Sequence, residues 1–411
     1  MEQPKFSLDL VLSNLATEAE KAQETVTKAS EVLLGPLDTD LATTPYEVIY
    51  EEDRVKLKHY RSTGESRFKT PLLVTYALIN RETMLDLQSD RSVVKTFLNN
   101  GIDLYMIDWG YPTRKDRYQT IDDHVDGYMN NIIDFIRRRC NVPKVNLMGI
   151  CMGGTFSVIY AALYPEKIKN LITTVTPTHF DTDKGLLHVW MKAIDVDRIV
   201  NTYGNLSGDI MNFGFLLLNP ARLMIDKYVG FFENMGNRSF VENFVRMEKW
   251  IFDSPDLPGE TFRQFVKDFY QENLLIQSKL EIGGRRVDLK RITMPLLNFY
   301  GLYDHLVPPE ACNLLVTQVG SDDTEDICLD TGHIGIYVSS KTQREFAPKI
   351  VRWLLERDGE ETAAKKDLEA SLAAEEMSTP RKRRPGGKKK PAKEKPTGIR
   401  PSLNQVIQTI L

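Results

Sequence analysis

One short stretch, Gly149 to Gly154, places Cys151 among glycines. The apolar run 145–148 before it predicts a strand, and the run 155–163 after it predicts a helix. A sharp turn from strand to helix crowds the backbone around Cys151, and glycine neighbours relieve that crowding. The thiol would then stand above the sheet edge at a helix N-terminus, where the helix dipole favours the thiolate. The pattern predicts a cysteine nucleophile. The alternative is a small buried cysteine beside glycines that pack a helix.

This arrangement is the G-x-nucleophile-x-G elbow of the α/β-hydrolase fold, with cysteine where serine is usual. In that fold the acid and then the histidine follow the nucleophile along the chain. His333 lies on a glycine-flanked loop after a predicted last strand at 327–329, and a helix is predicted at 345–355. His333 is therefore the predicted base. His305 is interpreted as a loop or supporting histidine.

The acid should follow the preceding strand. An apolar run at 295–300 predicts that strand, and Asp304 lies in the loop after it. Asp304 is the predicted partner of the histidine, although an aspartate that caps a turn is a common alternative. An oxyanion needs two backbone N–H donors, which we assign to Met152, directly after the nucleophile, and to Ile79, in the loop after the strand at 72–76.

Apolar runs elsewhere in the sequence predict the strands and helices that would position these residues. Two alternating runs near 47–60 predict an antiparallel hairpin, and four apolar runs separated by helical stretches predict a mostly parallel sheet (71–76, 103–108, 145–149 and 171–175). The expected domains are an N-terminal amphipathic helix region at 1–44, an α/β-hydrolase core at 45–176 and 291–356, a helical cap (lid) with no obvious strands at 177–290, and a helical, then basic and disordered tail at 357–411.

Several longer stretches resemble the catalytic subunit of class III polyhydroxyalkanoate synthases. The matching stretches are 105–112, 149–154, 246–259, 280–289, 304–309 and 332–338. The resemblance spans roughly residues 45–355 and places the family's nucleophile, aspartate and histidine on Cys151, Asp304 and His333. The C-terminal extension departs from the family.

The resemblance implies polymerisation of (R)-3-hydroxyacyl-CoA, chiefly 3-hydroxybutyryl-CoA, through an acyl-cysteine, with release of CoA. It also implies a second, helical synthase subunit and association with polyester granules. No metal and no cofactor are expected, because CoA leaves from the substrate. Two alternatives stay open: a cysteine hydrolase of the same fold that cleaves thioesters or lactones, and a catalytically silent granule scaffold.

Composition indicates the cellular compartment in which the protein is expected. The chain has 411 residues and four cysteines without regular spacing, which points to a reducing compartment. The first residues lack a basic region followed by an apolar one, and no run reaches the ~18 apolar residues of a membrane span. We therefore expect a cytoplasmic protein without a signal peptide or a transmembrane segment.

Charge and periodicity mark the two ends of the chain. Residues 381–400 contain ten Lys or Arg and one Glu, so a segment of net +9 stands in a chain of net −4. This proline-rich tail is predicted to be disordered, as a solvated tail or as a contact for an acidic partner such as nucleic acid or a granule coat. Apolar residues spaced by three and four between Leu8 and Leu33 predict a helix that packs on the enzyme itself or on a partner subunit.

Overall fold

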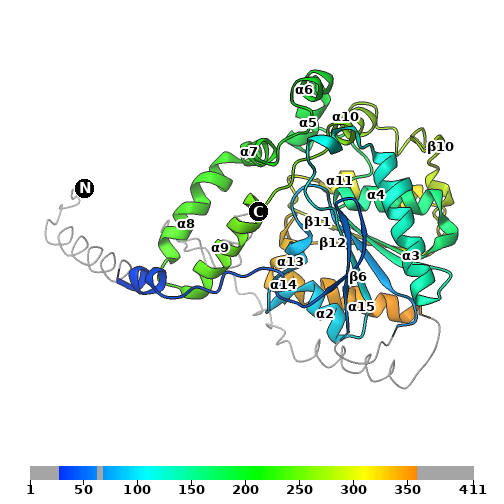
Figure 1. Ribbon diagram of the computed structural model, residues 1–411. Helices are drawn as coiled ribbons and strands as arrows, with labels where there is room; N and C mark the ends of the chain where they lie inside the picture. Colours follow the sequence, from blue (N-terminus) through cyan, green and yellow to red (C-terminus); the bar gives the residue numbers. More distant parts are fainter. Residues whose placement is uncertain (1–26, 63–67, 359–411) are drawn as a thin grey trace, which may run out of the picture.

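The computed structural model describes residues 27–62 and 68–358. An eight-stranded sheet forms its centre (Figure 1). In spatial order its strands are β1 (Glu47–Glu52), β2 (Val55–Tyr60), β6 (Leu104–Asp108), β3 (Leu72–Thr75), β7 (Val145–Ile150), β8 (Ile168–Thr174), β11 (Leu296–Gly301) and β12 (Thr324–Leu329). A small separate hairpin joins β4 (Asp86–Gln88) to β5 (Arg91–Ser92).

The pairing agrees with the predicted architecture. β1 and β2 form the antiparallel hairpin, and β2 runs antiparallel to β6. From β6 to β12 every neighbouring pair is parallel. The prediction of a mostly parallel sheet is therefore confirmed. Because the parallel strands share a direction, their carboxyl ends lie along one edge of the sheet, where the loops gather.

Helices cover both faces of this sheet (Figure 1). α2 (Val93–Asn99) packs with α15 (Phe346–Glu356), whereas α3 (Asn130–Cys140) and α4 (Met152–Leu163) both contact β7. Every residue of α4 is buried, which matches its apolar composition on all sides. Its buried hydroxyls are satisfied locally, since Thr155 donates to the carbonyl of Pro177 and Ser157 to that of Gly153. Short helices complete the core: α11 (Pro309–Cys312), α12 (Leu315–Gln318), α13 (Gly335–Val338) and α14 (Ser340–Gln343).

The segment between β8 and β11 contains the predicted cap, whose boundaries at 177 and 290 fall inside it. Its helices are α5 (Leu186–Ala193), α6 (Val196–Tyr203), α7 (Gly208–Leu218), α8 (Lys227–Asn234), α9 (Arg238–Phe252) and α10 (Gly259–Gln264). α8 and α9 form an arm that projects from the core, at the left in Figure 1. In the described part of the chain, no helix is both long and apolar enough to cross a membrane.

One local prediction for the cap is wrong. No strand is obvious in the sequence between 177 and 290, but β9 (Glu281–Ile282) and β10 (Arg285–Arg286) form a short antiparallel hairpin. Gly283 and Gly284 both have positive φ, which a tight two-residue hairpin turn requires. Arg285 pairs with Asp126 of the core at 2.5 Å, so this hairpin ties the end of the cap segment to the core.

The described part of the N-terminal region lies against the cap. The guanidinium of Arg246 on α9 donates to the carbonyl of Asp40, and Lys249 donates to the carbonyl of Thr39. Glu242 accepts from the backbone of Asp38. This part therefore contacts other parts of the same chain. Most of the predicted apolar stripe, before residue 27, lies outside the described residues, as does the basic tail after residue 358.

Candidate active site

Cys151 sits at the turn between β7 and α4 with φ 52° and ψ −123°, a strained backbone conformation for a non-glycine residue. Its glycine neighbours make the turn possible. A Cβ on Gly149 would lie 2.5 Å from the Cα of Gly154, and one on Gly153 would collide with the carbonyl of Tyr76. The elbow therefore needs the glycines for close backbone approach.

Backbone hydrogen bonds hold the strained residue in place. The N–H of Cys151 donates to the carbonyl of Thr174 at 2.9 Å, which continues the β7–β8 pairing. Its carbonyl accepts from Gly154 and Thr155 and so begins α4. The half-buried thiol thus lies at the positive end of a twelve-residue helix.

The structure brings the other two predicted residues together. Nδ1 of His333 lies 2.6 Å from Oδ2 of Asp304, and both side chains are almost fully buried. The second oxygen, Oδ1 of Asp304, accepts from the backbone N–H groups of Leu306 and Val307, each at 2.9 Å. With both oxygens engaged, the carboxylate is held rigidly and orients the imidazole ring.

The same contacts set the protonation of the histidine. Burial would lower the pKa of His333, but the Asp304 carboxylate and the Cys151 sulfur, each through its charge and a hydrogen bond, raise that pKa to about 10. Near neutral pH the site can therefore hold an imidazolium beside the cysteine, the pairing that activates cysteine nucleophiles. His305, next to Asp304, behaves in the opposite way, because burial lowers its pKa.

The surroundings of Cys151 are largely apolar. Its side chain packs against a small cluster formed by Val307, Ala311 and Cys312. Tyr76 and Tyr270 are buried nearby, where burial raises the pKa of each phenol and the charge of Cys151 raises it further. One side of the half-buried Cys151 side chain therefore faces apolar neighbours.

The predicted oxyanion donors lie on adjacent elements. Met152 is the first residue of α4, so its N–H has no acceptor within the helix. Gly153 abuts the carbonyls of Thr75 and Tyr76, which places the loop after β3 directly against the start of α4. Ile79 lies in that loop. The roles of the two N–H groups remain predictions.

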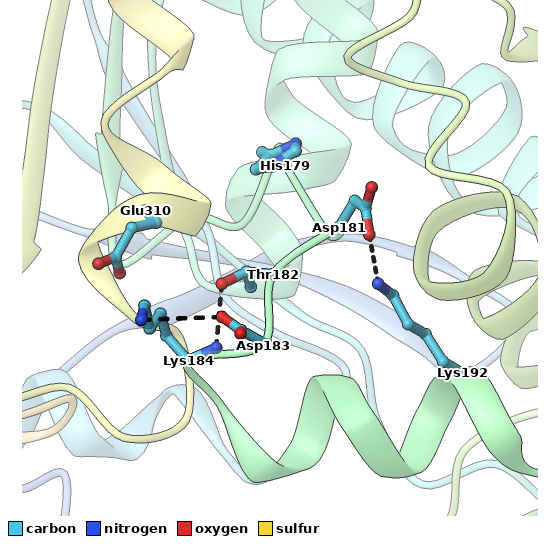
Figure 2. A pocket seen from close by; sticks show the side chains of 7 residues that line it. All are labelled: His179, Asp181, Thr182, Asp183, Lys184, Lys192 and Glu310. Atoms are coloured by element: carbon cyan, nitrogen blue, oxygen red, sulfur yellow. Dashed lines mark hydrogen bonds and ion pairs between the residues drawn. The ribbon is translucent and has the colours of Figure 1, made fainter.

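A surface cavity of about 410 Å³ lies where the cap meets α11, and Figure 2 shows its side chains. It is lined by His179, Asp181, Thr182, Asp183, Lys184, Lys192 and Glu310. Lys192 pairs with Asp181, and Lys184 lies 3.9 Å from Asp183, so carboxylates of the same rim offset both ammonium groups. None of the three predicted catalytic residues lines this cavity.

Two cap residues near the site were missed by the sequence analysis. Neither ring nitrogen of the buried His188 has a hydrogen-bond partner among the described residues, and its ring lies 5.2 Å from that of Tyr270. No motif surrounds His188, and Tyr270 belongs to an aromatic stretch whose spacing is equally typical of a core helix. Only the folded chain brings Tyr270 near Cys151 and His188 near Asp304.

Comparison with known proteins agrees with this geometry. A family model described as the alpha/beta hydrolase fold matches residues 71–339, and one described as the poly-beta-hydroxybutyrate polymerase (PhaC) N-terminus matches residues 6–97. The poly(3-hydroxyalkanoate) polymerase subunit PhaC of Allochromatium vinosum is 45% identical over 354 residues, which cover 86% of this chain and 100% of that protein. The subunit of Synechocystis sp. is 45% identical over 327 residues, 78% of this chain and 86% of the relative.

Fold and elbow therefore define an enzyme of the α/β-hydrolase class with cysteine at the nucleophile position. Within that class, the chain belongs to the poly(3-hydroxyalkanoate) polymerase PhaC family. The resemblance noted in the sequence is thus confirmed.

The packing of the elbow predicts a stability difference between two glycine substitutions. Gly149→Ala should lower the free energy of unfolding by about 3 kcal/mol, because the added methyl overlaps the backbone of α4. Gly214→Ala is the matched control. Gly214 lies inside α7 with open space around its Cβ position, so this change should raise the free energy by about 0.5–1 kcal/mol. Urea unfolding of both variants measures the difference, and equal effects would contradict the packing argument.

The Asp304 contact predicts the titration of His333. In the wild-type protein the imidazolium should persist through neutral pH and lose its proton only near pH 10. Asp304→Asn removes the negative charge that raises this pKa, so the proton should leave at lower pH. NMR titration of histidine-labelled protein measures both values, with His333→Gln to assign the signal. An unchanged pKa in the Asp304→Asn variant would show that Asp304 does not act on His333.

Proposed function

We propose that this protein polymerises (R)-3-hydroxyacyl-CoA, chiefly 3-hydroxybutyryl-CoA, into polyhydroxyalkanoate and releases CoA. The observation that carries the proposal is the Asp304–His333 pair, in a chain that has a cysteine elbow and matches PhaC polymerases over 99–100% of their length. CoA is a part of the substrate, and the proposed chemistry uses side chains and backbone groups without a separate cofactor.

In the first step, the sulfur of Cys151 attacks the thioester carbonyl of the substrate. The negative charge that develops on the carbonyl oxygen is stabilised by the N–H groups of Met152 and Ile79. The bond to the CoA sulfur then breaks, and CoA leaves with a proton supplied by the His333 imidazolium. Thiolate attack on a thioester yields another thioester of similar energy, so the acyl-enzyme forms without a large energetic penalty.

In the second step, a hydroxyl group of a further 3-hydroxyacyl unit or of the growing chain attacks the acyl-cysteine. His333 takes the hydroxyl proton while the oxygen forms an ester bond, and Cys151 departs as thiolate. Asp304 stabilises the imidazolium that forms. An alcohol is much harder to deprotonate than a thiol, so this step depends more strongly on Asp304 than the first step does.

A cysteine hydrolase with the same residues would pass the acyl group to water. The apolar packing around Cys151 and the cap over the core support the polymerase instead, because an ester product requires water to be kept out.

A single incubation distinguishes the two functions. Purified protein supplied with 3-hydroxybutyryl-CoA should release CoA and form insoluble polyester, whereas a hydrolase would form soluble 3-hydroxybutyrate. Cys151→Ala should lose both CoA release and polymer while keeping its fold, since removing one half-buried sulfur leaves a small cavity. A thiol reagent quantifies CoA, with the same Cys151→Ala variant correcting for protein thiols. Soluble monomer as the main wild-type product would contradict the polymerase.

The proposal extends to location and partners. We place the enzyme in the cytoplasm at the surface of polyester granules, with a helical second subunit. The apolar stripe of residues 8–33 supports the latter, since seven-residue periodicity is typical of helix pairing.

The basic tail should act in association rather than in catalysis. Deleting residues 380–411 removes a net charge of +9 from 381–400, while the predicted catalytic residues and α15 remain. Activity on soluble substrate should stay near the wild-type value, and retention on a DNA column at low salt should fall. High salt should abolish the retention of the full-length protein. Equal retention of both forms would instead support a merely solvated tail.

A further inference from the structure

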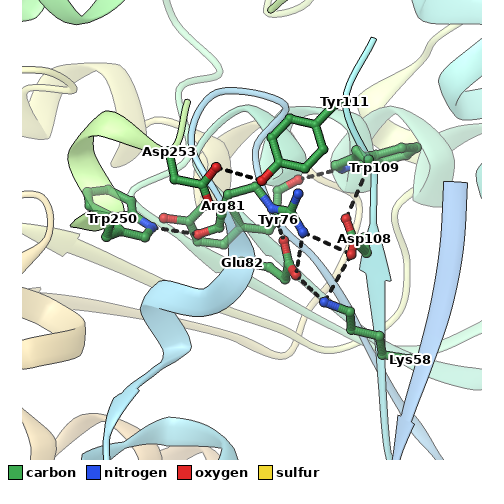
Figure 3. Close-up of polar contacts among 10 residues, drawn as sticks. Lys58, Tyr76, Arg81, Glu82, Asp108, Trp109, Tyr111, Trp250 and Asp253 are labelled. Carbon is green, nitrogen blue, oxygen red and sulfur yellow. Dashed lines mark hydrogen bonds and ion pairs between the residues drawn. The ribbon is translucent and has the colours of Figure 1, made fainter. Parts of the chain in front are cut away.

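The loop that follows β3 is held at both ends by indole groups, and Figure 3 shows these contacts. Nε1 of Trp109 donates to the carbonyl of Tyr76 at 2.9 Å, and Nε1 of Trp250 donates to the carbonyl of Arg81 at 2.8 Å. Trp109 follows β6 in the core, whereas Trp250 belongs to α9 of the cap. Ile79, the proposed oxyanion donor, lies between these two anchors. The loop is therefore fixed jointly by the core and the cap.

A buried group of four charges fixes the loop's Arg81 from the core side. The guanidinium donates to Asp108 at 2.9 Å and to Glu82 at 3.1 Å, and Lys58 binds the same two carboxylates at 2.9 and 2.5 Å. All four side chains are at most 11% exposed. Two positive and two negative charges compensate one another, and such buried pairs have a well-defined geometry. This group holds the far end of the loop to β2 and β6.

The cap approaches the same loop through the C-terminal end of α9. The hydroxyl of Ser254 donates to Oδ1 of Asn80, a residue in the left-handed region with φ 61°. The ring of Tyr111 lies under the Arg81 guanidinium, 4.6 Å away, and its hydroxyl donates to Asp253 at 2.6 Å. Contacts from the end of α9 thus reach the two residues directly after Ile79 and the side chain that stacks on Arg81.

We propose that Trp250 and Ser254 position the oxyanion-hole loop, so that acylation of Cys151 proceeds efficiently only when the end of α9 is seated against that loop. This inference rests on the proposed acyl transfer. Trp250 acts through the backbone carbonyl of Arg81 and Ser254 through the side chain of Asn80, so both are positioning residues. If the end of α9 moved away, the loop would lose both cap donors. It would keep the Trp109 bond and the charge group, so it would shift without unfolding.

Two rates separate positioning from general damage. Formation of the acyl-enzyme needs the oxyanion hole, whereas alkylation of Cys151 by iodoacetamide needs only a reactive thiol. Single-turnover CoA release from 3-hydroxybutyryl-CoA measures the first, and mass spectrometry of the Cys151 peptide measures the second. Ser254→Ala and Trp250→Phe should each slow acylation by about tenfold, less than the loss of an oxyanion donor itself. Alkylation should stay within about twofold of wild type.

Ser254→Thr is the matched control, because it keeps the hydroxyl at a half-buried position. This variant should acylate at a rate near that of the wild type. The positioning role is wrong if the Ala and Phe variants acylate normally, or if acylation and alkylation fall together. Ser254→Ala carries the test if Trp250→Phe does not fold.

The positioning role can also be tested if the proposed function is wrong. If the wild-type protein releases no CoA from 3-hydroxybutyryl-CoA, the polymerase proposal fails. Release of p-nitrophenol from p-nitrophenyl butyrate then measures acylation of Cys151 instead. Slower p-nitrophenol release in Ser254→Ala with unchanged alkylation would support the positioning role, and equal release would overturn it.

Discussion

Everything in the site depends on the sharp reversal of the backbone at Cys151. A non-glycine residue with φ 52° is unfavourable in isolation, so the surrounding structure must hold it there. The β7–β8 pairing fixes one side of the residue, and the first turn of α4 fixes the other. The glycines let α4 approach β3 closely, which in turn places the loop with Ile79 against the start of the helix. Strain at one residue thus orders the predicted nucleophile and the predicted oxyanion donors together.

Buried charges have different roles beside His333 and beside the loop after β3. The Asp304 carboxylate is buried, and its two oxygens contact His333 and two backbone donors, so its charge acts on the imidazole. On the β3 side, the cations Arg81 and Lys58 and the anions Asp108 and Glu82 neutralise one another. Their contacts fix the position of the loop after β3. The first arrangement raises a pKa at the reacting centre. The second keeps a backbone segment in place without leaving net charge in the interior.

The sequence was sufficient for the parts of the site that rest on local patterns. The elbow around Cys151, the strand before Asp304 and the loop of His333 each follow from short-range rules, and the parallel sheet follows from spaced apolar runs. The hairpin at Gly283 was missed because two-residue strands leave no periodicity. The clamp from Trp250 to Arg81 was missed for another reason: its partners are 169 positions apart, and no local pattern reports such a contact.

The cap leaves the sheet after β8 and returns at β11, and these strands are direct neighbours, with Thr174 opposite Phe299. Because the two strands are parallel, the insertion leaves at the carboxyl end of β8 and must cross the sheet to the amino end of β11, where Leu296 lies opposite Leu171. Closing such a loop costs entropy that grows only with the logarithm of its length. A long insertion between β8 and β11 therefore costs little more closure entropy than a shorter one. The connection between β8 and β11 is thus a place where a family can exchange or enlarge a whole helical insertion while strand order and elbow stay the same.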